Sequence, residues 1–429
     1  MKMLNNSRSH GLWERTAPEA PHTSILQYAH KQDVAVVGGG YTGLSTALHL
    51  AQAGVKVSVL EAVEIGFGAS GRNAGLVNAG LWMKPKDVKS SLGAPFGEQV
   101  LQLLGNGPAE VWSLIDKHAI DCQAVRNGTL HCAVGEAGLD ELGERERQWQ
   151  KRGAPVKFLN AEETAARIGT TAYSGSLLDL RAGTIQPLGY VRGLARAAIS
   201  AGAKVYSSSG VTGTERSNGK WTVRTPSGSV EADWIVVATD AYTKAPWQEL
   251  RHEQIHLPYF NVATRPLSDK LQKSILPNRE GCWDTKKILS SFRLDQEGRL
   301  VFGSIGALGG TGARIHRAWA TRAIRKLFPQ IWEVELESEW YGMIGTTSNH
   351  LPRFHRFAPN VVSICGYNGR GISPATVFGR VLADHILGNV GDADLPLPVT
   401  TPETPAFRAL KENYYEVGAQ LAHLVDARF

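Results

Sequence analysis

A short glycine-rich turn near the N-terminus is the first place where residue types and spacing indicate chemistry. The turn begins at Gly38, ends at Gly43 and follows the pattern G-x-G-x-x-G, with Gly40, Tyr41 and Thr42 inside it. Such glycines allow a tight turn and a close approach of backbone to a pyrophosphate, and a following helix offers N–H donors and partial positive charge. We therefore expect Gly38 to Gly43 to bind the phosphates of a dinucleotide.

An acidic residue lies at the distance along the chain where a dinucleotide needs a hydrogen-bond acceptor for its ribose. Glu61 lies 18 residues after Gly43, and a carboxylate at about that distance accepts hydrogen bonds from the ribose hydroxyls of an adenosine. The same carboxylate repels a 2′-phosphate, which argues against NADP. Glu61 is thus a second predicted dinucleotide contact.

The elements that position these residues are a strand, a helix and a second strand. Residues 33–37 and 55–60 are short apolar runs rich in β-branched residues, and residues 44–54 have helical periodicity that ends at a glycine. A strand, turn, helix and strand within about thirty residues form the βαβ unit of a parallel sheet. The expected fold class is therefore α/β, or α+β over the whole chain, with a Rossmann-like dinucleotide-binding domain.

A second glycine-rich segment, IGFGASGRNAG at residues 65–75, discriminates between NAD and FAD. With it, the chain resembles the D-amino-acid-oxidase-like superfamily of FAD-dependent oxidoreductases. The match is strongest to bacterial γ-glutamylputrescine oxidoreductases and L-pipecolate-oxidase-like enzymes. The resemblance extends over about residues 33–387 and includes the segments WIVVATDAYT and GYNGRGISPATVFGRVLADHILG. An NAD-dependent dehydrogenase would have no need of the segment at 65–75.

The resemblance implies a discontinuous, Rossmann-like FAD-binding domain with a parallel sheet and a substrate-binding domain with a mostly antiparallel sheet. The FAD-binding domain is expected to comprise residues 31–90, 150–250 and 350–395, and the substrate-binding domain residues 91–149 and 251–349. Residues 1–30 are expected to be an irregular N-terminal arm, and residues 396–429 a C-terminal extension. A length of 429 residues exceeds what a single core usually supports, which agrees with two domains.

Further FAD contacts follow from the resemblance rather than from the residue pattern alone. A helix that begins near Ser373 is expected to direct its N-terminus at the flavin, where its dipole would stabilise negative charge on the reduced ring. The FAD is expected to be non-covalent, because residues 343–346 contain no cysteine where some relatives tether the flavin. The implied contacts are Ser70, Gly71, Arg72, Asn73, Gly75, Leu76, Val211, Thr239, Gly369, Gly371 and Ile372.

Arg370 lies between two of the predicted flavin-contacting glycines, where the γ-glutamylputrescine enzymes generally carry histidine. A guanidinium there could pair bidentately with a substrate carboxylate, or it could support the flavin or pair with an internal acid. Trp82, Tyr341, His350 and Arg353 are further substrate-binding candidates. For each of these four, core packing or a surface charge is the competing interpretation.

The chemistry implied is oxidation of a C–N bond by hydride transfer to flavin N5, which gives an imine. This reaction requires orientation and a dry pocket more than acid–base groups, so we propose no side-chain base and the catalytic residues stay unknown. The leading substrate is a small α-amino acid, for example a cyclic secondary one such as L-pipecolate. The alternatives are γ-glutamylputrescine or another polyamine derivative, and, from another class, a non-catalytic flavin-binding protein. The electron acceptor is O2, a quinone or another compound.

The composition of the chain also limits which partners, metals and membrane attachments are expected. The net charge of +6 comes from scattered Lys and Arg, so no nucleic-acid partner is expected. The four cysteines form no metal-binding or disulfide pattern, and we expect no metal and reduced thiols in a cytoplasmic enzyme. No apolar run approaches the length of a transmembrane helix, while peripheral membrane contact stays open.

Overall fold

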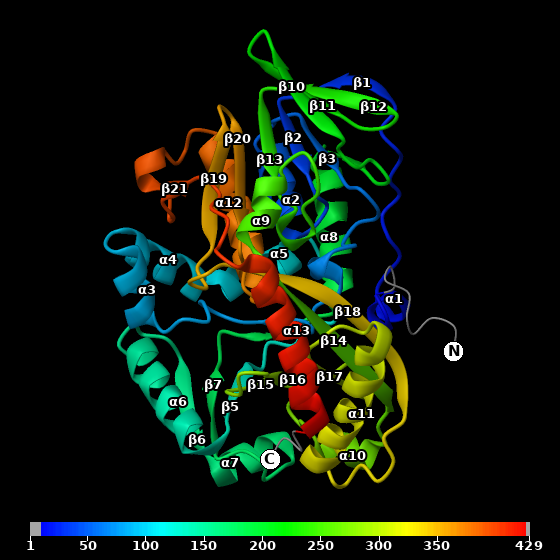
Figure 1. The fold of residues 1–429 in the computed structure, drawn as a ribbon, viewed down its shortest axis with the longest axis vertical. Coiled ribbons are helices and arrows are strands. Elements are labelled where there is room, and N and C mark those ends of the chain that lie inside the picture. The colour runs from blue at the N-terminus through cyan, green and yellow to red at the C-terminus, as the bar shows by residue number, and fades with distance from the viewer. Residues whose placement is uncertain (1–9, 426–429) are drawn as a thin grey trace.

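The computed structural model describes residues 10–425, which form two large sheets with helices around them (Figure 1). The first is a seven-stranded sheet in the order β21-β19-β20-β13-β2-β3-β9, parallel except for the β19–β20 pair. The apolar residues of β2 and β3 are all buried, which is typical of a parallel sheet that is covered on both faces. Its strands are β2 Val34–Val37, β3 Val57–Leu60, β9 Lys204–Tyr206, β13 Trp234–Val237, β19 Arg353–Ala358, β20 Val361–Cys365 and β21 Val399–Thr400.

Three helices pack together beside this sheet. Helix α2 (Tyr41–Gln52) contacts both α8 (Pro187–Ser200) and α12 (Ile372–Ile386), so segments far apart in the sequence form one layer. The first strand, the glycine turn, α2 and β3 occur in the order that the sequence predicts, which confirms the βαβ unit. The predicted helix near residue 373 is α12.

The second large sheet has eight strands in the order β18-β14-β17-β16-β15-β5-β7-β6. Every pair is antiparallel except β15–β5, in agreement with the expected mostly antiparallel sheet. One expectation is wrong: β6 and β7 belong to this sheet, although residues 150–250 were assigned to the FAD-binding domain. The strands are β5 Thr129–Ala133, β6 Val156–Asn160, β7 Gly175–Asp179, β14 Ile255–Pro266, β15 Gly281–Asp284, β16 Ser290–Leu294, β17 Arg299–Ile305 and β18 Leu336–Thr346.

Residues 10–425 also contain two small sheets, three short 3-10 helices and ten α-helices outside the α2–α8–α12 layer. A four-stranded sheet contains β1 Tyr28–Lys31, β10 Gly213–Ser217, β11 Lys220–Arg224 and β12 Gly228–Ala232, while β4 Leu76–Val77 pairs with β8 Gly183–Thr184. The helices are α1 Leu12–Thr16, α3 Pro85–Leu92, α4 Phe96–Gly105, α5 Gly107–Lys117, α6 Gly135–Gln150, α7 Ala161–Ile168, α9 Gln248–Glu253, α10 Asp269–Ser274, α11 Gly310–Leu327 and α13 Arg408–Val425. None of the helices among residues 10–425 is both long and apolar enough to cross a membrane.

The N-terminal arm is more ordered than expected. Residues 1–9 lie outside the described part of the chain, but α1 and β1 form within residues 10–31, and Leu12 and Trp13 are fully buried. The Trp13 indole donates a hydrogen bond to the Asn73 carbonyl (2.9 Å) and packs edge-on against Trp340 at 5.3 Å between ring centres. The arm thus holds the segment that contains Asn73 against the second sheet.

We predict that Trp13→Ala lowers the free energy of unfolding by about 3–5 kcal/mol, because it leaves a large cavity and an unpaired carbonyl. Urea denaturation of the FAD-loaded protein measures this change. Trp332→Ala is the matched control, since Trp332 is 93% exposed and its loss should change stability by no more than about 0.5 kcal/mol. Equal effects of the two substitutions would contradict the structural role of the arm.

Candidate active site

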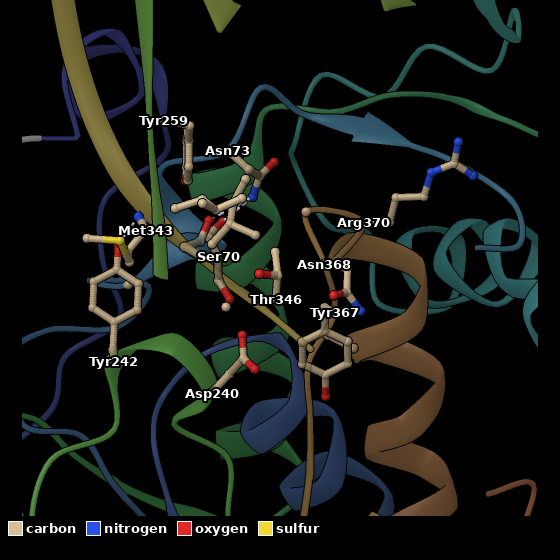
Figure 2. Close-up of a pocket in the computed structure, with 18 of the residues that line it drawn as sticks. Ser70, Asn73, Asp240, Tyr242, Tyr259, Met343, Thr346, Tyr367, Asn368 and Arg370 are labelled. Carbon is tan, nitrogen blue, oxygen red and sulfur yellow. Dashed lines mark hydrogen bonds between the residues drawn. The ribbon is translucent and has the colours of Figure 1, made fainter. Parts of the chain in front are cut away.

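A cavity of about 1260 Å³ is lined by residues of both large sheets and of the loops between them. Its volume exceeds the ~300–1,000 Å³ typical of a site for one ligand, so it has room for a substrate beside a cofactor. Figure 2 shows side chains from the end of β18 and from the turns after β13 and β20 around this space. The glycine turn and Glu61 also line it.

The glycine turn brings the backbone to the cavity with no side chain at its first three positions. Gly38 has φ +109°, a conformation that favours glycine, and a Cβ at Gly43 would collide with the Gly38 carbonyl. Gly40 is the N-cap of α2 and has no side chain to satisfy the first turn of the helix. A Cβ on Gly40 would lie 2.9 Å from Ser70 Oγ, so a side chain there would fill the space between the turn and the predicted flavin segment.

Glu61 is fixed at the end of β3 by two backbone hydrogen bonds. Its carboxylate accepts from Gly39 N (2.8 Å) and from Val63 N (2.9 Å). Burial raises the pKa of Glu61, and the hydrogen bonds oppose this shift. Hydroxyl donors from an adenosine ribose would further stabilise the charged form. Val211 and Thr239, both predicted contacts, line the same cavity.

The segment at residues 65–75 is connected to the glycine turn by side-chain hydrogen bonds. Ser70 Oγ accepts from Tyr41 N (3.1 Å), and Asn73 Nδ2 donates to the Tyr41 hydroxyl (3.3 Å). Ser70, Asn73 and Leu76 all line the cavity, together with Gly38, Gly40, Tyr41 and Thr42 of the turn.

Four residues that were expected to contact FAD do not line the cavity. They are Gly43, Gly71, Arg72 and Gly75. Gly71 and Gly75 are packed against neighbouring backbone, where a Cβ would collide with a carbonyl oxygen. Arg72 is 2% exposed and donates to the carbonyls of Phe67 (2.8 Å) and Tyr341 (3.2 Å). Arg72 therefore connects the segment to β18, and its contact with the cofactor stays a prediction.

The loop between β20 and α12 closes the opposite side of the cavity. Gly369, Gly371 and Ile372 line it, and Gly371 is the N-cap of α12. The Tyr367 hydroxyl forms a 2.6 Å hydrogen bond with Thr42 Oγ1 of the glycine turn. Gly366 N donates to Asp240 (2.8 Å), whose pKa is raised by burial. The two helix N-termini, of α2 and α12, therefore border one space.

Arg370 lies against two tryptophan rings in the wall of the cavity, and these rings pack edge-on against each other. Its guanidinium carbon is 4.7 Å from the Trp82 ring centre and 4.5 Å from that of Trp283. Its Nη1 donates to the carbonyls of Ala79 (3.2 Å) and Leu81 (2.9 Å), while Nε is buried without a hydrogen-bond partner. Burial, with a smaller effect of nearby Arg145, lowers the pKa of Arg370 to about 9, so the group is charged at neutral pH.

The other predicted substrate residues separate into two groups. Trp82 and His350 line the cavity with Arg370, whereas Tyr341 and Arg353 do not. Tyr341 packs against the hydrophobic core of the second sheet. Arg353 donates to Asn349 Oδ1 (2.8 Å) and to the Leu351 carbonyl (3.3 Å). The structure therefore does not bring these two residues to the site.

Sequence reasoning missed several lining residues, chiefly His131, Arg145, Tyr259, Asn261 and Trp283. His131 and Trp283 are opposite each other in the parallel β5–β15 pair and stack at 3.3 Å between ring centres. Burial, together with Arg145 and Arg370, lowers the pKa of His131 far below its ordinary value, so it is neutral at pH 7. The long-range strand pairing that assembles them has no local sequence signal.

The groups that line the cavity fit FAD. Two helix N-termini, a glycine turn and a ribose-binding carboxylate are the groups that a flavin dinucleotide requires. All four cysteines are buried, and the lining formed by the described residues includes none of them.

Comparison with known proteins agrees with this geometry. Residues 33–385 match the family of FAD dependent oxidoreductases, and the chain belongs to this family. It uses FAD and is an oxidoreductase of the amine and amino-acid class. The chain is 32% identical to γ-glutamylputrescine oxidoreductase of Escherichia coli, with 92% of each chain covered. It is 31% identical to the probable oxidoreductase OrdL of Rhizobium meliloti, with 93% of each chain covered.

Solved structures share the fold at lower identity. Glycine oxidase from Geobacillus kaustophilus superimposes with a TM-score of 0.68 at 22% identity, covering 84% of this chain and 95% of that one. L-Amino acid deaminase from Proteus myxofaciens gives a TM-score of 0.71 at 17% identity, covering 87% and 93%. These likenesses establish the fold class.

We predict that Glu61→Lys weakens FAD binding at least tenfold, since loss of a charged acceptor for hydroxyl groups costs roughly 1.5–3 kcal/mol. Titration of the apoprotein with FAD, followed by flavin fluorescence, measures the affinity. Glu64→Lys provides the control, because it adds the same charge in the same loop, while the Glu64 side chain is 46% exposed and lies outside the cavity lining. Full FAD occupancy of Glu61→Lys at micromolar protein would refute the role of Glu61.

Proposed function

We propose that this chain oxidises the C–N bond of an amine that also carries a carboxylate group. The observation that supports this specificity is Arg370, a buried guanidinium in the cavity wall. Among the described residues, none gives it a carboxylate hydrogen bond. A buried charge is costly unless it is paired, and a substrate carboxylate would supply the missing partner.

The neighbours of Arg370 add to the positive potential. Arg145 is buried and pairs with Glu141 (3.0 Å), whose side chain is 41% exposed. His131 is neutral and contributes no charge. Both tryptophan rings are within cation–π distance of the Arg370 guanidinium, and contacts of this kind stabilise a cation without neutralising it. This end of the cavity therefore favours an anionic group.

The other walls would exclude water from the reacting atoms and orient them. Tyr242, Tyr259 and Met343 enclose one side of the space in Figure 2. The Tyr242 hydroxyl accepts from Met343 N (3.0 Å), which fixes both residues. Burial raises the pKa of Tyr259, whose hydroxyl therefore stays protonated. When bound, FAD supplies the ring that takes a hydride at N5 from the carbon bearing nitrogen, so that an imine is released.

Two substrates are consistent with this proposal. A small α-amino acid, such as L-pipecolate, carries its carboxylate next to the reacting carbon. The second candidate is γ-glutamylputrescine. It is supported by the similarity to the γ-glutamylputrescine oxidoreductase of Escherichia coli and by the mixed charges in the cavity lining. Those charges, Glu141, Arg145 and Lys287, suit the zwitterionic amino-acid end of a longer substrate. No side-chain base is proposed for either substrate.

We predict that Arg370→Ala lowers kcat/KM for carboxylate-bearing amines by roughly 30- to 5,000-fold, because loss of a buried charge partner costs about 2–5 kcal/mol. Arg370→Lys should recover part of this loss, since it keeps the charge without the planar fork. Steady-state rates with L-pipecolate and piperidine, which lacks the carboxylate, measure the effect, and the loss should appear only with the former. γ-Glutamylputrescine is assayed in the same way against its decarboxylated analogue.

Arg353→Ala is the control for Arg370→Ala, because it removes an arginine that lies outside the cavity lining. Its kcat/KM and flavin content should match those of the unaltered protein. If Arg370→Ala loses FAD, the arginine supports the cofactor through the carbonyls of residues 79 and 81, and the carboxylate assignment fails. Equal losses of kcat/KM for amines with and without a carboxylate would also overturn this assignment.

A further inference from the structure

The outer surface of α13 is unusually apolar. Eight of the fourteen large hydrophobic side chains that are exposed in the described residues lie between positions 407 and 425. Five of them, which we call the outer stripe, lie on the helix itself at spacings of 4, 3, 4 and 3 residues. The outer stripe consists of Leu410, Tyr414, Val417, Leu421 and Leu424, each more than half exposed. This alternation is the repeat of a helix that packs along another helix.

The opposite face of α13 attaches the helix to the body of the protein through polar contacts. Glu412 accepts hydrogen bonds from His256 N (2.9 Å) and from Arg251 (3.2 Å). Nearer the C-terminal end, His423 and His316 of α11 form a 2.7 Å hydrogen bond between their Nδ1 atoms. Figure 1 shows α13 lying across the front of the second sheet beside α11. A surface helix normally buries its apolar face, and α13 does the reverse.

We propose that the outer stripe is the contact through which two copies of this chain associate, α13 against α13. A repeat of 3.5 residues is satisfied by a second helix with the same repeat, and this chain supplies one. The positions that flank the stripe are Lys411, Asn413, Gly418 and Gln420, with a single charge among them. Two copies can therefore meet about a two-fold axis without like-charge repulsion. A helix that binds a lipid surface has a polar face rich in Lys and Arg, which these flanks lack.

The pairing would also brace a wall of the active-site cavity. Tyr414, Tyr415, Gly418 and Ala419 of α13 line that cavity, so the contact between copies borders it. A stripe of five side chains is smaller than the ~800 Å² per partner of a standard interface. We therefore expect a dimer that dissociates in the micromolar range.

Sedimentation equilibrium of the FAD-loaded, full-length chain tests the proposal, at about 1 to 100 µM protein to span the expected dissociation range. The apparent mass should rise from near 46.5 kDa towards twice that value. The double variant Leu410→Glu with Leu421→Glu should stay monomeric at every concentration. The control, Ala409→Glu with Ala422→Glu, adds the same charges to the same helix outside the stripe and should associate like the unaltered chain. Flavin content and thermal unfolding verify that both variants are folded.

Three results would overturn the proposal. The first is a monomer at all concentrations, and the second is undiminished association of the stripe variant. The third is a monomer that co-sediments with phosphatidylcholine–phosphatidylglycerol vesicles in a stripe-dependent manner, which would assign the stripe to a lipid surface.

Discussion

The site depends on one constraint: the two phosphates of a dinucleotide must be met, away from bulk water, by backbone N–H groups. Glycines at the points of closest contact permit that approach, and the Gly38–Gly43 turn provides them where β2 leads into α2. Gly43 has no space for a Cβ beside the Gly38 carbonyl, so helix and strand pack at a distance that other residues would not allow. Ser70, Asn73 and Tyr367 then attach two remote segments to this turn through hydrogen bonds.

The substrate end of the cavity depends on the contacts of one side chain, that of Arg370. Arg370 lies in the loop between β20 and α12 and donates hydrogen bonds to the carbonyls of residues 79 and 81, which follow the predicted flavin segment. Trp82 and Trp283 contact its guanidinium, and Trp283 comes from the second sheet. One arginine therefore connects both sheets and places a positive charge in the cavity wall, at the energetic cost of burying that charge.

Much of the cofactor side could be predicted from the sequence, because its signals are local. Glu61 and the glycine turn belong to one βαβ unit, and the residues of that unit are neighbours in the chain. Helix α1 was not predicted, because a helix of five residues without a side-chain cap gives no clear sequence signal. Its burial comes from a contact with Trp340, which is more than three hundred residues away in the chain.

The substrate side was harder to predict because it depends on long-range strand pairing. His131 and Trp283 meet only through the β5–β15 register, which composition and periodicity do not reveal. Tyr341 was expected at the site because its segment approaches the active site in relatives. Side chains two residues apart share one face of a strand, so Tyr341 and Met343 are on the same face of β18. The difference is one of position along the strand: its last four residues, Met343–Thr346, line the cavity, whereas Tyr341 comes before them.

The most direct test of the central claim is anaerobic reduction of the bound flavin, followed by its absorbance near ~450 nm. Amines that carry a carboxylate, among them L-pipecolate and γ-glutamylputrescine, are mixed with the FAD-loaded protein beside their carboxylate-free counterparts. The account predicts bleaching by at least one carboxylate-bearing amine and much slower bleaching by its counterpart. Bleaching by carboxylate-free amines alone, or by none of the amines while dithionite reduces the flavin fully, would contradict it.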